Sequence, residues 1–372
     1  MKIAILGAGM VGSAIALDLA KEHEVTCFDV NKDNLESVHR KDPSIGVAAN
    51  DLSDHRQYGD FLAPFEIVVT AVPGYMGFNT LKAVIRAQKD VVDISFFPED
   101  ALQLDELAKK KGVTVITDCG VAPGMSNVFL GRYNELMRID EFACYVGGLP
   151  VERKPPFQYK APFSPVDVIQ EYIRPARLVE AGAVVAKPAL SDREILEFGE
   201  VGKLEAFNTD GLRSLISTMG HIPNMKEKTL RYPGHLDIIC AMQQAGFFDT
   251  SPLRIKKVDI SPLEFTSKLL VNEWKLEPGE KEFTVMKVIM KGEGKTVTYD
   301  LLDHYDQLTN TSSMARTTGY TCAAAVNLIA RGLFNDTGVF PPEMVGKDET
   351  CFDFIMKYLA ERNVTWKKTE SR

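Results

Sequence analysis

Long hydrophobic runs are missing from this chain of 372 residues. None approaches the roughly 20 consecutive apolar residues that a membrane-spanning helix needs. Residues 1–6 lead straight into a glycine loop, without the apolar core and cleavage site of a secretory signal. The sequence therefore predicts a cytoplasmic protein with no membrane partner.

Clustered cysteines are missing too. The six cysteines are scattered, with no C-x-x-C pair and no histidine at metal-ligand spacing, so no metal site is expected. We expect reduced and mostly buried thiols. The cysteines are Cys27, Cys119, Cys144, Cys240, Cys322 and Cys351.

The chain also lacks an excess of positive charge. The 43 lysines and arginines are outnumbered by 51 aspartates and glutamates, which gives a formal charge of −8. Without a basic stripe, a nucleic-acid backbone finds little to bind, so no nucleic-acid partner is expected. What the chain does contain, 45% hydrophobic and 25% charged residues, is typical of a globular protein of two or three domains.

The first third of the chain predicts a doubly wound α/β domain. Short β-branched runs alternate with longer amphipathic segments, which is the pattern of βαβ units around a parallel sheet. Helices are expected between the strands, notably at 11–21, 76–88 and 98–111. This is the arrangement of a Rossmann dinucleotide-binding domain. The expected strands lie at residues 2–6, 24–30, 45–49, 67–72, 91–94 and 113–117.

After Gly124 the pattern changes to that of an α+β domain. A long alanine-rich helix at 314–333, stopped by the glycine and prolines of 338–342, precedes a last helix at 349–362. We expect these C-terminal helices to return to the first domain, and the tail at 365–372 to be frayed. Alternating stretches predict a mostly antiparallel sheet at 141–146, 177–187, 203–207, 282–290 and 295–301, with helices at 166–172, 212–219, 235–244 and 262–275. The expected domains are residues 1–123, 124–310 and 311–372.

The loop GAGMVG at residues 7–12 follows a strand and opens a helix, the context that a dinucleotide fingerprint requires. Its glycines allow the tight turn, the close approach of pyrophosphate and the packing of the helix, whose N-terminus faces the phosphates. Asp29 ends the second strand, where its carboxylate can accept hydrogen bonds from both ribose hydroxyls and repel a 2′-phosphate. The sequence therefore predicts NAD in preference to NADP, although Lys32 lies close by.

Further contacts to the cofactor are expected at the carboxyl ends of the other strands. Asp51 is either a contact for the adenine amino group or the start of a helix. The small residues at 70–74 mark either the point where the dinucleotide crosses the sheet or an ordinary turn. The full expected set is Gly7, Ala8, Gly9, Met10, Val11, Gly12, Asp29, Val30, Asp51, Leu52, Ala71, Val72, Pro73, Asp93, Ser95, Cys119 and Gly120.

The stretch DCGVAPGMSN at residues 118–127 resembles a motif of the saccharopine dehydrogenase family of amino-acid oxidoreductases. Within that family the chain is most similar to the L-lysine 6-dehydrogenases, and the resemblance runs nearly from end to end. Further matching stretches are YVGGLP at 145–150, LEAF at 204–207, TLRYPGH at 229–235, SMAR at 313–316 and GVFPPE at 338–343.

One departure from the family pattern bears on the substrate. Saccharopine-forming members typically carry GLDPG where this chain has GVAPG at 120–124, so Ala122 replaces an acidic group near the substrate amine. The resemblance implies NAD-dependent oxidative deamination of the side-chain amine of L-lysine, giving ammonia, NADH and 2-aminoadipate 6-semialdehyde, which cyclises to a piperideine carboxylate. It also implies a homo-oligomer built through the second domain. The alternatives are a saccharopine- or carboxynorspermidine-type reductase and a non-catalytic NAD-binding protein.

The implied reaction requires a group that accepts a proton and orients water. Asp118, at the carboxyl end of the sixth strand, is the first candidate, unless it caps the helix after Gly124. Asp93, at the end of the neighbouring strand, could share the task or brace a loop. His235 could titrate near neutrality or be a satisfied turn histidine.

An amino-acid substrate also requires a cation for its carboxylate. Arg231 suits that role as a bidentate donor, unless it forms a structural salt bridge. Asp210 could face the lysine chain, although a helix cap is the simpler interpretation. Tyr159 and Lys160 lie in a proline-rich stretch, 154–165, that could form a lid over the substrate.

Overall fold

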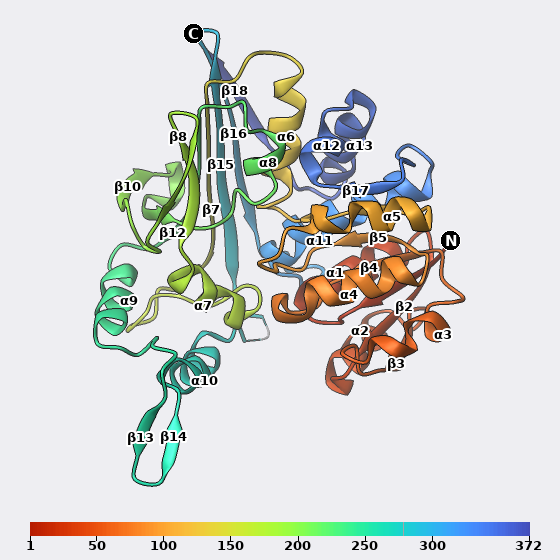
Figure 1. The fold of residues 1–372 in the computed structure, drawn as a ribbon, viewed down its shortest axis with the longest axis horizontal. Helices are drawn as coiled ribbons and strands as arrows, with labels where there is room; N and C mark the ends of the chain where they lie inside the picture. Colours follow the sequence, from red (N-terminus) through yellow and green to blue (C-terminus); the bar gives the residue numbers. More distant parts are fainter. Residues whose placement is uncertain (278) are drawn as a thin grey trace.

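The computed structural model describes residues 1–277 and 279–372 and contains two large β-sheets (Figure 1). The first sheet is parallel throughout, with the strand order β17-β6-β5-β4-β1-β2-β3. The direction of strand addition reverses between β1 and β4, which confirms the doubly wound α/β fold. Its strands are β1 (Lys2–Leu6), β2 (Glu24–Asp29), β3 (Gly46–Ala49), β4 (Ile67–Thr70), β5 (Asp90–Asp93), β6 (Thr114–Ile116) and β17 (Gly338–Phe340).

Helices cover both faces of this parallel sheet, which explains why its central strands are near-continuous apolar runs. Ile3 and Ile5 of β1 belong to the core shared with α1 and α11, whereas Ala4 and Leu6 belong to the core under α4 and α5. The alternation follows from the two-residue period of a strand. The helices are α1 (Met10–Leu19), α2 (Lys32–Lys41), α3 (Tyr58–Phe61), α4 (Gly74–Arg86), α5 (Asp105–Lys111) and α11 (Ser313–Ala330), with 3-10 turns η1 (His55–Gln57) and η2 (Ala101–Leu104).

The second sheet is mixed and has the strand order β10-β11-β12-β7-β15-β16-β18, with β8 pairing β12 and β9. Only β12 and β7 run parallel to each other; the other pairs described for this sheet are antiparallel. Its strands are β7 (Glu141–Pro150), β8 (Ala176–Glu180), β9 (Ala183–Lys187), β10 (Glu194–Glu197), β11 (Lys203–Asn208), β12 (Asn224–Arg231), β15 (Glu282–Gly292), β16 (Lys295–His304) and β18 (Lys367–Ser371).

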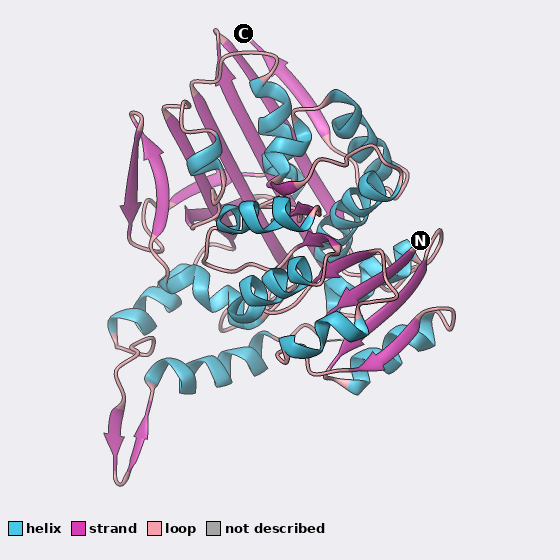
Figure 2. Cartoon of the chain, turned by 45° about the vertical axis from the view of Figure 1, so that its right-hand side comes forward, coloured by secondary structure: helices cyan, strands magenta, loops and turns pink. Residues whose placement is uncertain are grey.

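The helices around the second sheet differ in their surroundings. Helix α6 leads from the first sheet into β7, and α7 lies at the end of the sheet that faces the first domain. A separate hairpin, β13 (Leu253–Ile255) with β14 (Val258–Ile260), projects away from the body of the molecule (Figures 1 and 2). The helices are α6 (Met125–Asn134), α7 (Pro165–Ile173), α8 (Leu215–Thr218), α9 (His235–Gln244) and α10 (Pro262–Trp274), with the 3-10 turn η3 (Gly199–Val201).

The C-terminal segment returns to the first domain, as expected. Helix α11 packs on α1, and β17 extends the parallel sheet beside β6. Helices α12 (Pro342–Gly346) and α13 (Glu349–Ala360) follow, and the buried carboxylate of Asp18 on α1 accepts hydrogen bonds from Tyr358 and Arg362. Among the described residues, no helix is both long and apolar enough to cross a bilayer.

Four expectations about the elements were wrong. The tail is not frayed but forms β18, which pairs with β16 through its backbone. The expected strand at 177–187 is the hairpin of β8 and β9, which turns at Ala181 and Gly182, both with positive φ. The parallel sheet has a seventh strand, β17, in the segment expected only to stop a helix. The expected helix at 212–219 shrinks to the single turn of α8.

Candidate active site

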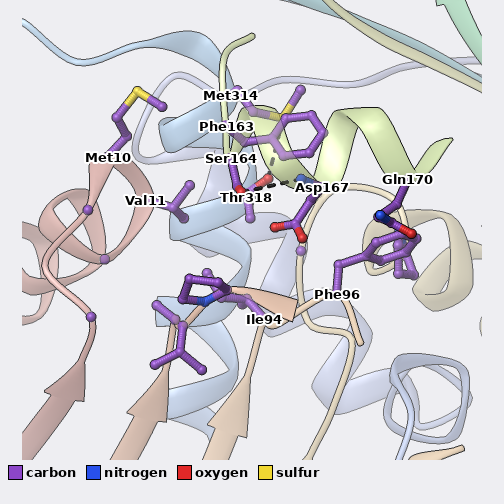
Figure 3. A pocket seen from close by; sticks show the side chains of 18 of the residues that line it. Met10, Val11, Ile94, Phe96, Phe163, Ser164, Asp167, Gln170, Met314 and Thr318 are labelled. Carbon is purple, nitrogen blue, oxygen red and sulfur yellow. Dashed lines mark hydrogen bonds between the residues drawn. The ribbon is translucent and has the colours of Figure 1, made fainter. Parts of the chain in front are cut away.

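A cavity of about 630 Å³ opens where the carboxyl ends of the parallel strands face the second sheet. Its first wall consists of the glycine loop and the residues that follow β2, β4, β5 and β6. Its second wall comes from α7, from residues 146–148 of β7 and from one face of β12. Figure 3 shows Met10 and Val11 on one side, and Asp167 and Phe163 on the other. Met314 and Thr318 of α11 close the cavity between these walls.

The glycine loop has the geometry of a pyrophosphate cradle. A Cβ on Gly7 would lie 2.3 Å from the carbonyl oxygen of Ala71, and one on Gly12 would lie 1.9 Å from that of Gly7, so both positions require glycine. Gly9 faces open space in the cavity and forms the N-cap of α1 without any side-chain cap. The unpaired N–H groups at the start of α1 are therefore available to a diphosphate.

Asp29 is positioned at the far end of this cradle. Its Oδ2 accepts hydrogen bonds from the backbone of Ala8 at 2.8 Å and from Asn34 at 3.3 Å, while Oδ1 accepts one from the Asn31 backbone at 2.8 Å. These contacts orient the carboxylate at the cavity wall, where a ribose diol would meet it. Of the described residues, no lysine or arginine lines the cavity near Asp29, and Lys32 is not part of the wall.

Most of the expected cofactor contacts line the cavity, including Val30, Leu52, Ala71, Val72, Pro73 and Gly120. Asp51 also lines it, but its carboxylate accepts hydrogen bonds from the backbone and hydroxyl of Ser53, which lower the pKa of Asp51. The side chains of Ala8, Ser95 and Cys119 are buried and do not line the cavity, so a cofactor contact at these residues stays a prediction.

Asp93 requires a second correction, because it was expected both to bind the cofactor and to share the catalysis. Its carboxyl group is completely buried and accepts a hydrogen bond from the hydroxyl of Thr70 below the cavity wall. Burial raises the pKa of Asp93 to about 7. Its position makes it a brace between β4 and β5, not a contact for the substrate.

Asp118 lines the cavity but is not a free carboxylate. Its Oδ1 accepts a hydrogen bond from Nε of Arg213 at 2.8 Å, and both side chains are buried. The guanidinium of Arg213 also donates to the carbonyl of Phe97. The alternative role of Asp118 as a helix cap is wrong, because Gly124 is the N-cap of α6 and Asn127 accepts its N–H.

Arg231 lies at the cavity wall, and each of its three guanidinium nitrogens donates a hydrogen bond. Nε donates to the hydroxyl of Tyr172 at 2.9 Å, one terminal nitrogen donates to the Leu230 carbonyl at 3.0 Å, and the other pairs with Glu171 at 2.8 Å. The ring of Tyr159 lies 4.3 Å from the guanidinium carbon. The structural salt bridge, which the sequence offered as the alternative role of Arg231, is therefore present, with Glu171 as the partner.

His235 and the proposed lid residues lie behind Arg231, and their predicted roles need correction. His235 is held between the Phe157 carbonyl at Nδ1 and the hydroxyl of Tyr172 at Nε2, and burial lowers the pKa of its imidazole to about 3. It is outside the cavity and stays neutral near pH 7. Tyr159 is buried beneath Arg231, and the ammonium of Lys160 donates to the carbonyl of Glu273. Neither residue contacts the cavity.

Asp210 lines the cavity and is paired with Arg177. Arg177 donates to both of its carboxylate oxygens, Nε to Oδ1 at 2.8 Å and Nη2 to Oδ2 at 2.9 Å. The helix cap was the wrong interpretation, because α8 begins only at Leu215, after Ser214. Asp210 therefore contributes to the cavity as a neutralised carboxylate.

Several cavity residues escaped the sequence-based prediction. Glu227 and Thr229 were not predicted, and they alternate along β12 with the predicted Arg231, so all three point to the cavity face of that strand. Asp167, Glu171 and Arg174 recur at the three- to four-residue spacing of a helix and line the cavity from α7 and its C-cap. Figure 3 places Asp167 and Gln170 on the same wall, near Phe96. The helical spacing along α7 was the signal that could have identified this group.

Comparisons with known proteins extend the resemblance. A sequence profile described as the saccharopine dehydrogenase C-terminal domain matches residues 120–364, and one described as the saccharopine dehydrogenase NADP binding domain matches residues 3–116. The mitochondrial alpha-aminoadipic semialdehyde synthase of Bos taurus is 23% identical over 287 residues, which cover 72% of this chain and 31% of that protein. The saccharopine dehydrogenase (NADP(+), L-glutamate-forming) of Saccharomyces cerevisiae is 24% identical over 258 residues, covering 66% of this chain and 58% of that protein.

A solved structure supports the same fold. The apo saccharopine dehydrogenase (L-Glu forming) from Saccharomyces cerevisiae superposes with a TM-score of 0.80 at 20% sequence identity, and each chain is covered completely. Similarity at this identity establishes the fold and leaves the chemistry to the residues of the cavity. The chain spans only 31% and 58% of the two curated relatives described above.

Proposed function

Because the chain belongs to the saccharopine dehydrogenase family, we propose that it is an amino-acid oxidoreductase that uses NAD to remove the side-chain amine of L-lysine. The reaction is an oxidative deamination to 2-aminoadipate 6-semialdehyde with release of ammonia. The observation that carries the proposal is the composition of a single cavity, which continues from the glycine loop to a chamber rich in carboxylates.

That chamber suits a substrate with two amines and one carboxylate. Five carboxylates line it, and three of them, Asp118, Glu171 and Asp210, are paired with Arg213, Arg231 and Arg177. Asp167 and Glu227 have no ion pair among the described residues and can attract the ammonium groups of lysine, while Arg174 can attract its carboxylate. The carboxylates are Asp118, Asp167, Glu171, Asp210 and Glu227.

Arg174 is the better candidate for the substrate carboxylate. Its Nη1 is buried and has no hydrogen-bond partner among the described residues, and its guanidinium carbon lies 5.5 Å from the ring centroid of Phe96. In Arg231, by contrast, each guanidinium nitrogen already donates a hydrogen bond, to Tyr172, Leu230 or Glu171. A buried donor without a partner is costly, and a bidentate carboxylate would satisfy it.

Asp29 supports NAD as the cofactor. An acidic side chain at this position accepts the ribose hydroxyls and repels a 2′-phosphate, which would otherwise need a lysine or arginine in contact. The matched profile and the yeast relative carry NADP in their descriptions, so the choice of NAD rests on this chain's own residues. Gly7, Gly9 and Gly12 would hold the pyrophosphate.

The roles of the remaining residues follow from their positions. A bound nicotinamide supplies the hydride acceptor. Ala71, Ile94 and Val121 form the apolar wall at the ends of β4, β5 and β6, and they exclude water from this part of the cavity. Thr209 and Thr229 on the opposite wall can orient the amine through their hydroxyls.

A saccharopine-type reductase remains the second candidate, since the names of the relatives favour it. Ala122 opposes it, because this residue lines the cavity where saccharopine-forming members typically carry an aspartate. A substrate panel separates the two functions. NADH formation with L-lysine and NAD, but not with saccharopine, is the expected result. Oxidation of saccharopine without oxidation of lysine would reject the lysine assignment.

We also propose a homo-oligomer built through the second domain, with residues 1–123, 124–310 and 311–372 as the structural units. The support is the projecting hairpin, where Leu253, Ile255 and Val258 are 53–60% exposed. An isolated two-stranded hairpin is only marginally stable in water, and a second copy would cover these side chains. Sedimentation equilibrium measures the assembly directly.

A further inference from the structure

One carboxylate of the chamber lacks a cation beside it. Three others are neutralised by guanidinium groups, in the pairs Asp118 with Arg213, Glu171 with Arg231, and Asp210 with Arg177. Asp167 has no ion pair among the described residues, but the charge of Arg174 on the same helix acts on it, and it accepts from the backbone N–H of Gly74. Glu227 has neither an ion-pair partner nor a nearby cation among the residues that the structure describes.

The contacts of Glu227 leave one of its oxygens free. Oε2 accepts a hydrogen bond from the hydroxyl of Thr209 at 2.7 Å and faces the backbone of Gly211. Oε1 has no hydrogen-bond partner within the described part of the chain, although the residue is 6% exposed and lines the cavity. The carboxyl group is therefore fixed at one oxygen and available at the other.

The electrostatic surroundings keep Glu227 partly protonated near neutral pH. Burial raises the pKa of Glu227 to about 8, and the like charges of Glu171 and Asp210 add to that effect. The hydrogen bond from Thr209 acts in the opposite direction. Across the sheet, Cys144 of β7 lies beside Glu227, and burial keeps the pKa of that thiol well above its usual range. A carboxyl group that titrates in this range can both accept and return a proton.

We propose that Glu227 is the catalytic residue that takes the proton from the substrate's reacting amine and returns it during hydrolysis. This inference rests on the proposed function. Three observations carry it: the position of Glu227 at the cavity wall, its free Oε1, and the absence of a neutralising cation among the described residues.

Oε1 of Glu227 accepts a proton from the ammonium, and a bound NAD⁺ would accept the hydride from the C–H bond that breaks at the amine carbon. Water adds to the resulting iminium carbon and loses one proton to solvent, while the protonated Glu227 returns its proton to the nitrogen. The C–N bond breaks as the C=O bond forms, and the hydroxyl proton leaves with the ammonia as an ammonium ion. In total, one alkyl ammonium, one NAD⁺ and one water give one aldehyde, one ammonium ion, one NADH and one proton.

The first test compares two glutamines. Glu227→Gln removes the proton acceptor and keeps the shape, so kcat should fall by roughly 100-fold or more while the Kd for NAD stays unchanged. Glu282→Gln is the matched control, because burial also raises the pKa of Glu282 to about 8. Glu282 begins β15, accepts the backbone N–H of Ser313 and lies outside the cavity. Glu282→Gln should keep the wild-type kcat and the increase of kcat with rising pH that we expect for the wild type.

The second test does not depend on turnover. Calorimetry of L-lysine binding to the complex with NADH should give an affinity that rises about tenfold as the pH increases through about 8, since only ionised Glu227 attracts the ammonium. The rise should be absent in Glu227→Gln. A Glu227→Gln variant with wild-type kcat and the same pH dependence of binding would overturn the proposal.

The substrate panel of lysine and saccharopine distinguishes a failure of the proposed function from a failure of the role of Glu227. If saccharopine or another amine is turned over in place of lysine, the lysine assignment falls and the Glu227 comparison is made with that substrate. If lysine is turned over equally by the wild type and Glu227→Gln, the function stands and the role of Glu227 is rejected. If the wild type turns over no amine on the panel, both are rejected.

Discussion

At the scale of single residues, the two arginines of the cavity have opposite surroundings. Arg231 is buried among Glu171, Tyr172 and Tyr159, so its charge is already compensated. Arg174 has a buried nitrogen with no partner among the described residues. We therefore expect Arg231 to support the structure and Arg174 to bind the substrate, and substitutions of the two residues should affect stability and KM differently.

Substituting each arginine by glutamine should have different consequences. Arg174→Gln should raise the KM for the amino-acid substrate roughly 10- to 100-fold with little change in unfolding, because it removes a charged hydrogen bond to the ligand. Arg231→Gln should lower the free energy of unfolding by about 3 kcal/mol, because it leaves Glu171 as an uncompensated charge. Initial rates and urea denaturation of both variants test this. Equal effects on KM and stability in the two variants would contradict the assignment.

Asp29 offers a test of cofactor choice. Asp29→Ser removes the carboxylate that would accept the ribose hydroxyls, so the Kd for NAD should rise roughly tenfold while that for NADP falls or stays constant. Asp29→Asn is the control, because its amide oxygen can still accept the N–H of Ala8 and preserve the loop. Titration of protein fluorescence with both cofactors gives the two constants. An unchanged Kd for NAD in Asp29→Ser would rule out the ribose contact.

Asp93 predicts a pH dependence of stability. Its pKa is about 7 in the folded protein, above the value of an unfolded aspartate, so the folded state binds more protons between about pH 4 and 7. The stability contributed by this group is therefore present at low pH and is lost as the pH rises. Asp93→Asn should remove that loss. The difference in free energy of unfolding between the variant and the wild type should therefore be about 2–3 kcal/mol more favourable to the variant at pH 8 than at pH 5. Urea unfolding at the two pH values measures the difference, and an equal offset at both would contradict it.

Local sequence was sufficient to place Gly7, Gly9, Gly12 and Asp29 at one cavity, because they belong to consecutive elements, β1, the glycine loop, α1 and β2. The pairings in the substrate chamber could not be predicted in this way. Asp118 meets Arg213 across 95 positions, a contact that only the folded chain creates. The sequence therefore identified Asp118 as a cavity residue but could not reveal that an arginine neutralises it.

At the scale of elements, the missed strands share a physical cause. β12 contains Lys226, Glu227 and Lys228 in succession, which hides the alternation expected of a strand with one buried face. β18 is exposed along its whole length and pairs through its backbone at the edge of the sheet, so no hydrophobic pattern marks it. Because β12 was not recognised, Glu227 and Thr229 could not be assigned to the cavity.

The packing of α6 on α12 gives a prediction about an element. A Cβ on Gly131 would lie 2.1 Å from the carbonyl oxygen of Glu343, so Gly131→Ala should force the helices apart and destabilise the protein by about 1–3 kcal/mol. Gly59→Ala on α3 is the control, since nothing lies within 4 Å of its Cβ position. Denaturation midpoints of the two variants test the contact. Equal midpoints would show that the helices can separate without cost.

At the scale of the whole molecule, the cavity depends on segments far apart in the chain. The glycine loop and α1 provide one wall and α7 the opposite wall, and α11 closes the space between them (Figure 3). β12 contributes to the same wall as α7. The doubly wound fold and the return of the C-terminal helices could be predicted, since each follows from local apolar patterns and the family resemblance. The chamber itself required the structure, because its walls meet only after the second sheet has formed.

The central claim is that this cavity oxidises the side-chain amine of lysine with NAD. The most direct measurement supplies L-lysine labelled with ¹⁵N at the side-chain amine and follows NADH by absorbance and the released ammonium by NMR. The account predicts equal amounts of NADH and ¹⁵N-ammonium, and unlabelled ammonium should not appear. Release of nitrogen from the α-amine, or no NADH from lysine under conditions where saccharopine is oxidised, would contradict it.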